Sequence, residues 1–181
     1  MHELSLKLQE FFFEAALATY AGHAPKTTIE GLPKSKVYHY ERDNYLYIDT
    51  YFTNGEQSGG QTVIYIKSED SPTFVPAWIM QYHGWCEGDN KEVLDFLKEV
   101  LSRTYRSRTF CGGRGKLFGE VNSARCLEYA NNWTGTFDHF SGEEKISKED
   151  VPEDGTGLET RDVFWHRYQG MTLLQEVQQE K

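Results

Sequence analysis

The spacing of apolar residues changes from a helical to an alternating pattern near residue 44, and this change constrains the fold more than any other feature. Residues 4–20 carry apolar side chains at helical spacing, including Leu8, Phe11 and Ala15. Residues 44–52 instead alternate as a half-buried strand does. One face of that strand holds Leu46, Ile48 and Phe52, and the other holds Tyr45, Tyr47, Asp49 and Tyr51.

The rest of the chain predicts further strands and one more helix. Residues 61–67 and 77–85 also alternate, and the glycine- and proline-rich turns around them favour an antiparallel meander. A second helix is predicted to begin at an Asp89 N-cap, with Glu92 completing a capping box. More strands are predicted near 124–130, 133–140 and 162–169.

Runs of consecutive strands are typical of an α+β fold. We therefore expect a single α+β domain over residues 1–181, with a mainly antiparallel, twisted sheet of about six strands and two helices. The expected order is helix, three strands, helix, three strands. Residues 173–181 form a polar tail that we expect to fray. No internal repeat is visible in the sequence.

Charge and cysteine usage restrict the partners and the compartment. The net charge is −9, so direct binding to nucleic acid is not expected. Three widely spaced cysteines without a CxxC pair favour reduced thiols in a cytoplasmic protein. No run of 18 apolar residues occurs, so a membrane partner is not expected either. The sequence indicates no cofactor.

Several motifs resemble a bacterial domain-of-unknown-function family. They are Tyr20-Ala-Gly22, His39-Tyr40-Glu41, Tyr45–Tyr51, Pro76–Gly84, Gly135–Glu144 and Trp165–Gly170. The resemblance extends over about residues 8–172. Members of this family occur alone or as the C-terminal part of helix-turn-helix (XRE-type) transcriptional regulators. The resemblance therefore implies an effector-type or accessory domain, and it supplies no reaction.

The tyrosine-rich face of residues 44–52 is the leading candidate for a ligand site. Aromatic walls with one carboxylate suit a small polar or cationic ligand. The predicted ligand-binding residues are Tyr45, Tyr47, Asp49, Tyr51, Trp78 and Tyr82. The alternative is that these aromatic residues pack beneath a helix as part of the core.

Histidines on predicted strands are candidates for catalysis. His139 and His166, with Glu144 as a carboxylate partner, could serve acid–base chemistry if the fold brings them together. His83 also lies on a predicted strand. The sequence contains no metal-binding motif, and we predict no metal site. The alternative is that the histidines are scattered and structural.

Two loops carry concentrated charge. Segment 106–116 contains Arg106, Arg108, Arg114 and Lys116 among glycines and could hold an anion. It is not a P-loop, because Leu117 stands where Ser or Thr is required. Residues 147–157 are predicted to be an acidic loop. Both segments look longer or more charged than the family pattern, and a solvated loop is the alternative for the basic one.

These patterns favour a small-molecule-binding, sensory or regulatory accessory domain with an aromatic-lined pocket. Two alternatives remain open. One is a protein-interaction module, which includes the possibility of a homodimer. The other is a hydrolase-like or metal-dependent enzyme that uses the strand histidines.

Overall fold

The computed structural model describes residues 2–22, 24–67, 72–116, 120–122, 126–150, 157 and 159–174. Two helices and eight strands are present in these residues, in addition to a short 3-10 turn at Glu87–Asp89. In chain order they are α1 (His2–Ala18), β1 (Lys36–Arg42), β2 (Tyr45–Asn54), β3 (Gln57–Ile66), β4 (Val75–Cys86), α2 (Lys91–Arg106), β5 (Glu120–Asn122), β6 (Leu127–Thr136), β7 (His139–Asp150) and β8 (Glu159–Thr172).

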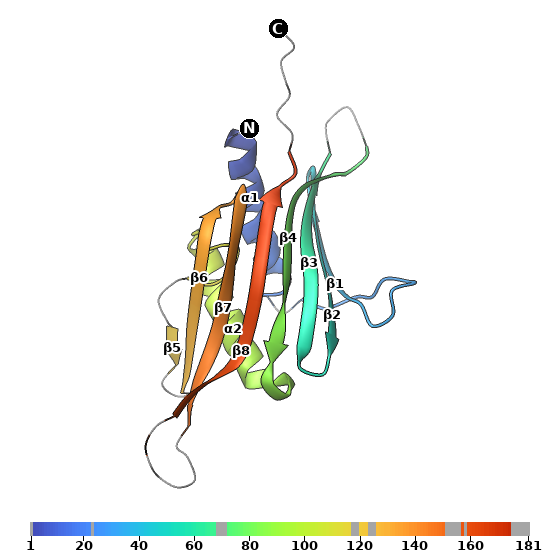
Figure 1. Cartoon of the computed structure of the whole chain (residues 1–181). Coiled ribbons are helices and arrows are strands. Elements are labelled where there is room, and N and C mark those ends of the chain that lie inside the picture. The colour runs from blue at the N-terminus through green and yellow to red at the C-terminus, as the bar shows by residue number, and fades with distance from the viewer. Residues whose placement is uncertain are drawn as a thin grey trace.

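The strands form a single antiparallel sheet in the order β1-β2-β3-β4-β8-β7-β6-β5, and both helices lie on one face of it (Figure 1). The α+β class and the antiparallel sheet are confirmed. The expected number of about six strands is wrong, because each helix is followed by four strands. The two extra strands, β1 and β5, are the edges of the sheet. Polar and charged residues such as His39 and Glu41 are common on edge strands and hide β1 from pattern analysis.

Two glycines of the predicted turn before residues 61–67, Gly59 and Gly60, lie inside β3. Gly59 and Gly60 pair with Phe52 and Tyr51 of β2, so the strand begins earlier than predicted. A side chain at Gly60 would place its Cβ 2.6 Å from the Tyr51 Cβ, which explains the glycine by close packing. The turn itself is at Gly55, which has a φ of 59°.

The boundary between β6 and β7 also differs from the prediction. The predicted strands near 124–130 and 133–140 are replaced by one strand that ends at Thr136 and another that begins at His139. Asn131 does not interrupt β6, because its side chain forms buried hydrogen bonds to a neighbouring loop. Residues 147–150 of the predicted acidic loop continue β7, whereas 151–156 and 158 lie outside the described residues.

The helices pack on the sheet through aromatic side chains. Phe12 of α1 contacts Trp78 of β4, with 5.2 Å between ring centroids, and Trp78 is fully buried. Helix α2 begins one residue later than predicted. Its N-cap is Asn90, whose Oδ1 accepts a hydrogen bond from the Glu92 amide at 3.0 Å.

The chain contains an internal repeat that the sequence did not reveal by inspection. Each half is one helix followed by four strands, and the sheet order is symmetric about the antiparallel β4–β8 pair. The register repeats as well: Tyr47 pairs with Ile64 in the first half, and Tyr129 pairs with Ile146 in the second. In the same way Asp49 pairs with Thr62, and Asn131 pairs with Glu144.

The two helices carry the clearest sequence trace of this repeat. Phe11, Glu14, Thr19 and Tyr20 recur with the same spacing as Phe96, Glu99, Thr104 and Tyr105. Thr19 and Thr104 also make the same bond, each donating its hydroxyl to the backbone carbonyl four residues earlier. We therefore interpret the fold as two copies of a helix–four-strand unit joined at β4 and β8.

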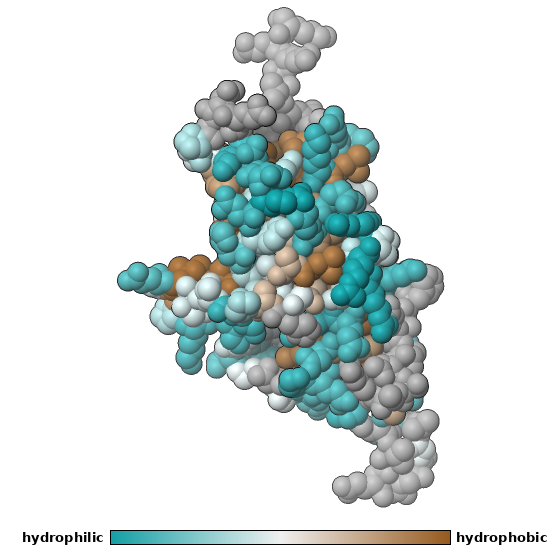
Figure 2. Space-filling view, turned by 180° about the vertical axis from the view of Figure 1, so that it is seen from behind, coloured by the Kyte–Doolittle hydropathy of each residue, from teal (hydrophilic) through white to brown (hydrophobic). Residues whose placement is uncertain are grey.

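The surface shows scattered rather than continuous hydrophobic groups. The side that bears the helices is mainly hydrophilic, with hydrophobic atoms gathered on the projection before β1 (Figure 2). Ile29 and Leu32 are the exposed large hydrophobic residues of that segment. Single exposed apolar side chains are ordinary on a monomer. None of the helices that the structure describes is long and apolar enough to cross a membrane.

Candidate functional site

A cavity of about 350 Å³ lies between the helix-bearing face of the sheet and the two helices. This volume is within the range of small-molecule sites. Of the six predicted ligand-binding residues, Tyr47, Asp49, Tyr51 and Tyr82 line the cavity, because alternation along β2 and β4 turns them toward the helices. The other two do not: Tyr45 stacks on Phe11 with 5.1 Å between ring centroids, and Trp78 is part of the core.

Asp49 is the acidic group in the deep part of the cavity wall. Its Oδ1 accepts hydrogen bonds from the Tyr82 hydroxyl at 2.7 Å and the Thr62 hydroxyl at 3.0 Å. No hydrogen bond from a described residue reaches Oδ2. The residue is only 4% exposed, and this burial raises the pKa of Asp49 to about 6 although both hydroxyls favour the ionised form. The carboxylate therefore has one oxygen available to a molecule in the cavity.

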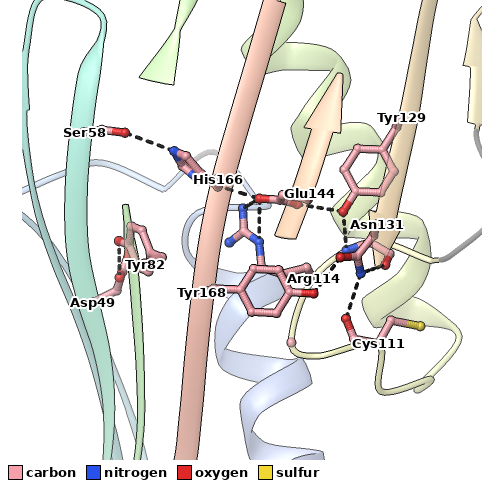
Figure 3. A network of polar contacts seen from close by, with 12 residues as sticks. Asp49, Ser58, Tyr82, Cys111, Arg114, Tyr129, Asn131, Glu144, His166 and Tyr168 are labelled. Carbon is pink, nitrogen blue, oxygen red and sulfur yellow. Dashed lines mark hydrogen bonds and ion pairs between the residues drawn. The ribbon is translucent and has the colours of Figure 1, made fainter. Parts of the chain in front are cut away.

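A buried ion pair between Arg114 and Glu144 borders the same cavity (Figure 3). The Arg114 Nε donates to Glu144 Oε1 at 2.8 Å, its Nη2 makes a second bond to the same oxygen, and the Tyr129 hydroxyl donates to Oε2 at 2.7 Å. Burial alone would raise the pKa of Glu144, but the attraction of Arg114 outweighs it and lowers the pKa to about 2. Glu144 is therefore ionised at neutral pH.

The residues 111–116, called here the plug segment, pack into the second half of the sheet. The Asn131 Nδ2 donates to the backbone carbonyls of Cys111 at 3.0 Å and Gly115 at 2.7 Å. The Gly115 amide donates to the Tyr129 hydroxyl at 2.9 Å. Glycine is required here, since a Cβ on Gly115 would lie 2.6 Å from the Tyr129 ring. The segment is thus held by specific bonds and is not a solvated loop.

The four basic residues proposed to bind an anion do not converge. Arg114 is buried against Glu144, whereas Arg106, Arg108 and Lys116 are exposed. Arg108 forms an ion pair with Glu10 of α1, with 3.5 Å between Nη1 and Oε2. Their proximity in sequence was misleading, because Arg114 is buried beside Glu144 whereas Arg106, Arg108 and Lys116 lie at the surface.

His166 is the predicted histidine that reaches the cavity. Its Nε2 lies 3.0 Å from the Ser58 Oγ, and its Nδ1 lies 3.6 Å from Glu144 Oε1. At that distance Nδ1 has no hydrogen-bond partner among the described residues. Burial lowers the pKa of His166 despite the nearby Glu144 carboxylate, so the ring is neutral at pH 7. Gly84 makes room for it, because a Cβ there would lie 2.2 Å from the ring.

The other two strand histidines do not join His166. His83 and His139 are exposed, and Glu144 of β7 is buried on the opposite face of the strand from His139. The three-histidine arrangement is therefore not formed. No group of three or more histidine, cysteine, aspartate or glutamate side chains suited to a metal occurs in the part of the chain that the structure describes. Cys86, Cys111 and Cys126 form no disulfide.

Ser58, Thr62 and several lysines also line the cavity, and no sequence pattern indicated them. Ser58 and Thr62 were not singled out because single hydroxyl residues in a strand carry no motif. Lys26, Lys36, Lys91 and Lys98 come from three distant segments of the chain. The internal repeat is the signal that could have identified Thr62. Thr62 pairs with Asp49 in the first half, as Glu144 pairs with Asn131 in the second.

Comparisons with known proteins place the chain in a family. A search of curated proteins finds no match, and a search of solved structures finds none either. A family model described as a domain of unknown function, DUF5680, matches residues 49–153, which is more than half of the 181 residues. The match includes Asp49, Tyr82, Arg114 and Glu144 and is shorter than the expected 8–172. The chain therefore belongs to the DUF5680 family of domains of unknown function.

Proposed function

We propose that this protein binds a small organic molecule in the cavity between its helices and its sheet. One observation carries the proposal: Asp49 is almost completely buried, yet its Oδ2 accepts no hydrogen bond from a described residue. Asp49 lines the cavity, and carboxyl groups whose pKa is raised by burial cluster at functional sites. The surrounding aromatic residues supply the apolar contact area that a ligand site needs.

The proposed role is sensory or regulatory. The resemblance to domains that form the C-terminal part of helix-turn-helix regulators supports it, since this resemblance implies an effector-type or accessory domain. The cavity lies where both helices meet the sheet, and a ligand there would contact α1, α2 and five strands together. Its binding would therefore stabilise the packing between both halves.

Tyr82 and Tyr168 offer a matched pair of substitutions. They occupy equivalent positions of the repeat, and each donates its hydroxyl to an Asx side chain, Asp49 at 2.7 Å and Asn131 at 2.6 Å. Only Tyr82 lines the cavity. A metabolite library in a thermal-shift assay should give a ligand that raises the Tm of the parent by roughly 5–10 °C at 100 times its Kd. We expect Tyr82→Phe to weaken that ligand about tenfold.

Tyr168→Phe serves as the control. It should lower the Tm without ligand but leave the ligand-dependent increase unchanged. Equal loss of binding in both variants would contradict the proposed location of the site. A library without any stabilising compound would contradict ligand binding itself and favour the protein-interaction alternative.

The contact between Ser58 and His166 favours hydrolysis as a second candidate function. The Ser58 hydroxyl, the neutral His166 ring and the Glu144 carboxylate follow the order of a nucleophile, a base and an orienting group. Ser58 would attack an ester carbonyl, and His166 Nε2 would take its proton and return it to the leaving alkoxide. We rank this function second, because Arg114 already neutralises Glu144 and the distance to Nδ1 is long.

An active-site label tests this second function directly. A fluorophosphonate should add covalently to Ser58 and give one adduct in intact mass spectrometry. The adduct should disappear in Ser58→Ala and in His166→Gln but persist in Ser107→Ala, which removes an exposed hydroxyl after α2. A parent protein that takes up no label would rule out Ser58 as an activated nucleophile.

A further inference from the structure

The internal repeat presents two versions of one side-chain cluster, which we call the first and second clusters. The first consists of Tyr47, Asp49, Tyr51 and Tyr82, and the second consists of Tyr129, Asn131, Trp133 and Tyr168. Both have three aromatic residues around one Asx side chain. All four members of the first cluster line the cavity.

The second cluster is already occupied by the chain itself. The plug segment lies over it: a Cβ on Gly112 would meet the Tyr168 ring at 2.8 Å and the Trp133 Cβ at 3.1 Å, and Gly115 lies against Tyr129. Asn131 binds two plug carbonyls, and Arg114 of the plug pairs with Glu144 (Figure 3). A peptide segment with a cationic side chain thus fills the second cluster.

The segment at the equivalent place in the first half takes a different course. After α1 the chain passes Ala21, whose carbonyl accepts from the Ser102 hydroxyl at 2.9 Å, and reaches Thr27, which forms a bridge with Val37 of β1. The backbone follows this path to the edge of the sheet, and the Lys26 side chain extends from it over Tyr51 of the first cluster. The cavity lies where the second half has its plug.

The Asx residue differs between the clusters in one chemical property. Asn131 uses its amide nitrogen to donate to two carbonyl groups. An ionised Asp49 has only acceptor oxygens, so the group that meets its Oδ2 must be a hydrogen-bond donor. A cationic donor fits best, because it also compensates the buried negative charge.

The part of the cavity wall that carries the lysines favours an anionic group, in contrast to Asp49. Lys26, Lys36 and Lys98 line it, and none of them forms an ion pair with a described carboxylate. Lys26 and Lys36 both lie over the Tyr51 ring, at 5.6 and 5.5 Å from its centroid. Glu56 and Asp95 also line the cavity, but Asp95 pairs with Lys91, so the lysines leave an excess of positive charge that favours an acidic group at the entrance.

We propose that the ligand is a small amphoteric molecule, with an ammonium or guanidinium group that binds Asp49 and a carboxylate or similar acidic group that binds the three lysines. This inference rests on the proposed binding function and specifies its ligand class. An amino acid or an amino-acid-like molecule has both groups within the dimensions of the cavity.

Matched compounds test the two charge requirements separately by calorimetry at pH 7.5. The first set is L-arginine, 4-guanidinobutyrate, agmatine, which lacks the carboxylate, and valerate, which lacks the cation. The second set is L-tyrosine, tyramine and 3-(4-hydroxyphenyl)propionate. In at least one set, we expect the amphoteric compound to bind at least about tenfold more tightly than either partner that lacks one charge.

Two variants assign the charges to their residues. Asp49→Asn should weaken the amphoteric compound about 30-fold or more, because one member of a buried charge pair is removed. Asp43→Asn, an exposed aspartate in the β1–β2 turn, should change nothing. A Lys26→Gln, Lys36→Gln, Lys98→Gln triple variant should weaken the amphoteric compound but leave the compound without an acidic group unaffected.

The possible failures are distinguishable. If the metabolite library yields ligands that depend on Tyr82 but lack a protonated nitrogen, the binding function stands and the amphoteric class is wrong. If Asp49→Asn binds the amphoteric compound as well as the parent does, the assignment of the cation to Asp49 is wrong. If no compound of either set or of the library binds, both the proposed binding function and the proposed ligand class are wrong.

Discussion

Asp49→Asn is expected to make the ligand-free protein more stable by about 3 kcal/mol at pH 8. The pKa of Asp49 is about 6 in the folded protein and 3.8 in an ordinary aspartate. A difference of one between two pKa values corresponds to about 1.36 kcal/mol, so ionisation of the buried carboxyl costs about 3 kcal/mol. Asparagine avoids this cost and keeps an acceptor for Tyr82. The second half of the fold already contains this arrangement, because Asn131 Oδ1 accepts a hydrogen bond from the Tyr168 hydroxyl at the equivalent position.

The stabilising effect of Asp49→Asn should depend on pH. The folded protein binds more protons than the unfolded chain between about pH 3.8 and pH 6, so the stability of the parent falls as the pH rises through this interval. Asp49→Asn lacks this dependence. Urea unfolding at pH 4, 6 and 8 should show a stability difference that grows from pH 4 to pH 8 by about 2.4 kcal/mol. A difference that stays constant with pH would contradict a burial-raised pKa at Asp49.

Arg114→Met is expected to destabilise the protein by about 3–5 kcal/mol at pH 7, because it leaves the Glu144 carboxylate buried without its cation. In the parent, the pKa of Glu144 is lowered to about 2, so its stabilising contribution is complete above pH 4.5 and disappears as the pH falls toward 2. In the variant, Glu144 can take up a proton. The deficit should therefore be smaller at pH 4 than at pH 7 in chemical denaturation.

The double variant Arg114→Met/Glu144→Gln separates charge from packing. Glutamine keeps an acceptor for the Tyr129 hydroxyl and removes the charge that Arg114 compensates. The double variant should recover most of the loss of Arg114→Met. If the double variant instead loses the sum of the stability lost by Arg114→Met and by Glu144→Gln alone, Arg114 acts by filling space over the second cluster and not by its charge.

The tyrosine face and its carboxylate were predictable from the sequence because they obey a period of two. Alternation along residues 44–52 placed Tyr47, Asp49 and Tyr51 on one side, and all three line the cavity. The same reasoning placed Trp78 and Tyr82 together, yet only Tyr82 reaches the cavity. Alternation assigns a face, but the position of a residue along the strand decides whether it lies below a helix or beside the cavity.

The plug and the repeat were not predictable in the same way. Arg114 looks like a solvated loop residue in sequence, and its burial depends on Glu144, which is 30 positions away. The repeat is visible only after the strands are aligned in register, since Asp49 and Asn131, or Thr62 and Glu144, share a position but not an identity. Non-local pairing, and not local propensity, determines both features.

The antiparallel contact between β4 and β8 has a consequence for the number of cavities in the molecule. Two separate copies of the helix–four-strand unit, paired in the same way along their last strands, would form a two-fold dimer with two identical cavities. Fusion of the copies into a single chain lets each one change alone. Here the plug segment covers the second cluster and the cavity lies at the equivalent place in the first half, so the chain has the strand order of a two-fold dimer but the two halves differ at this position.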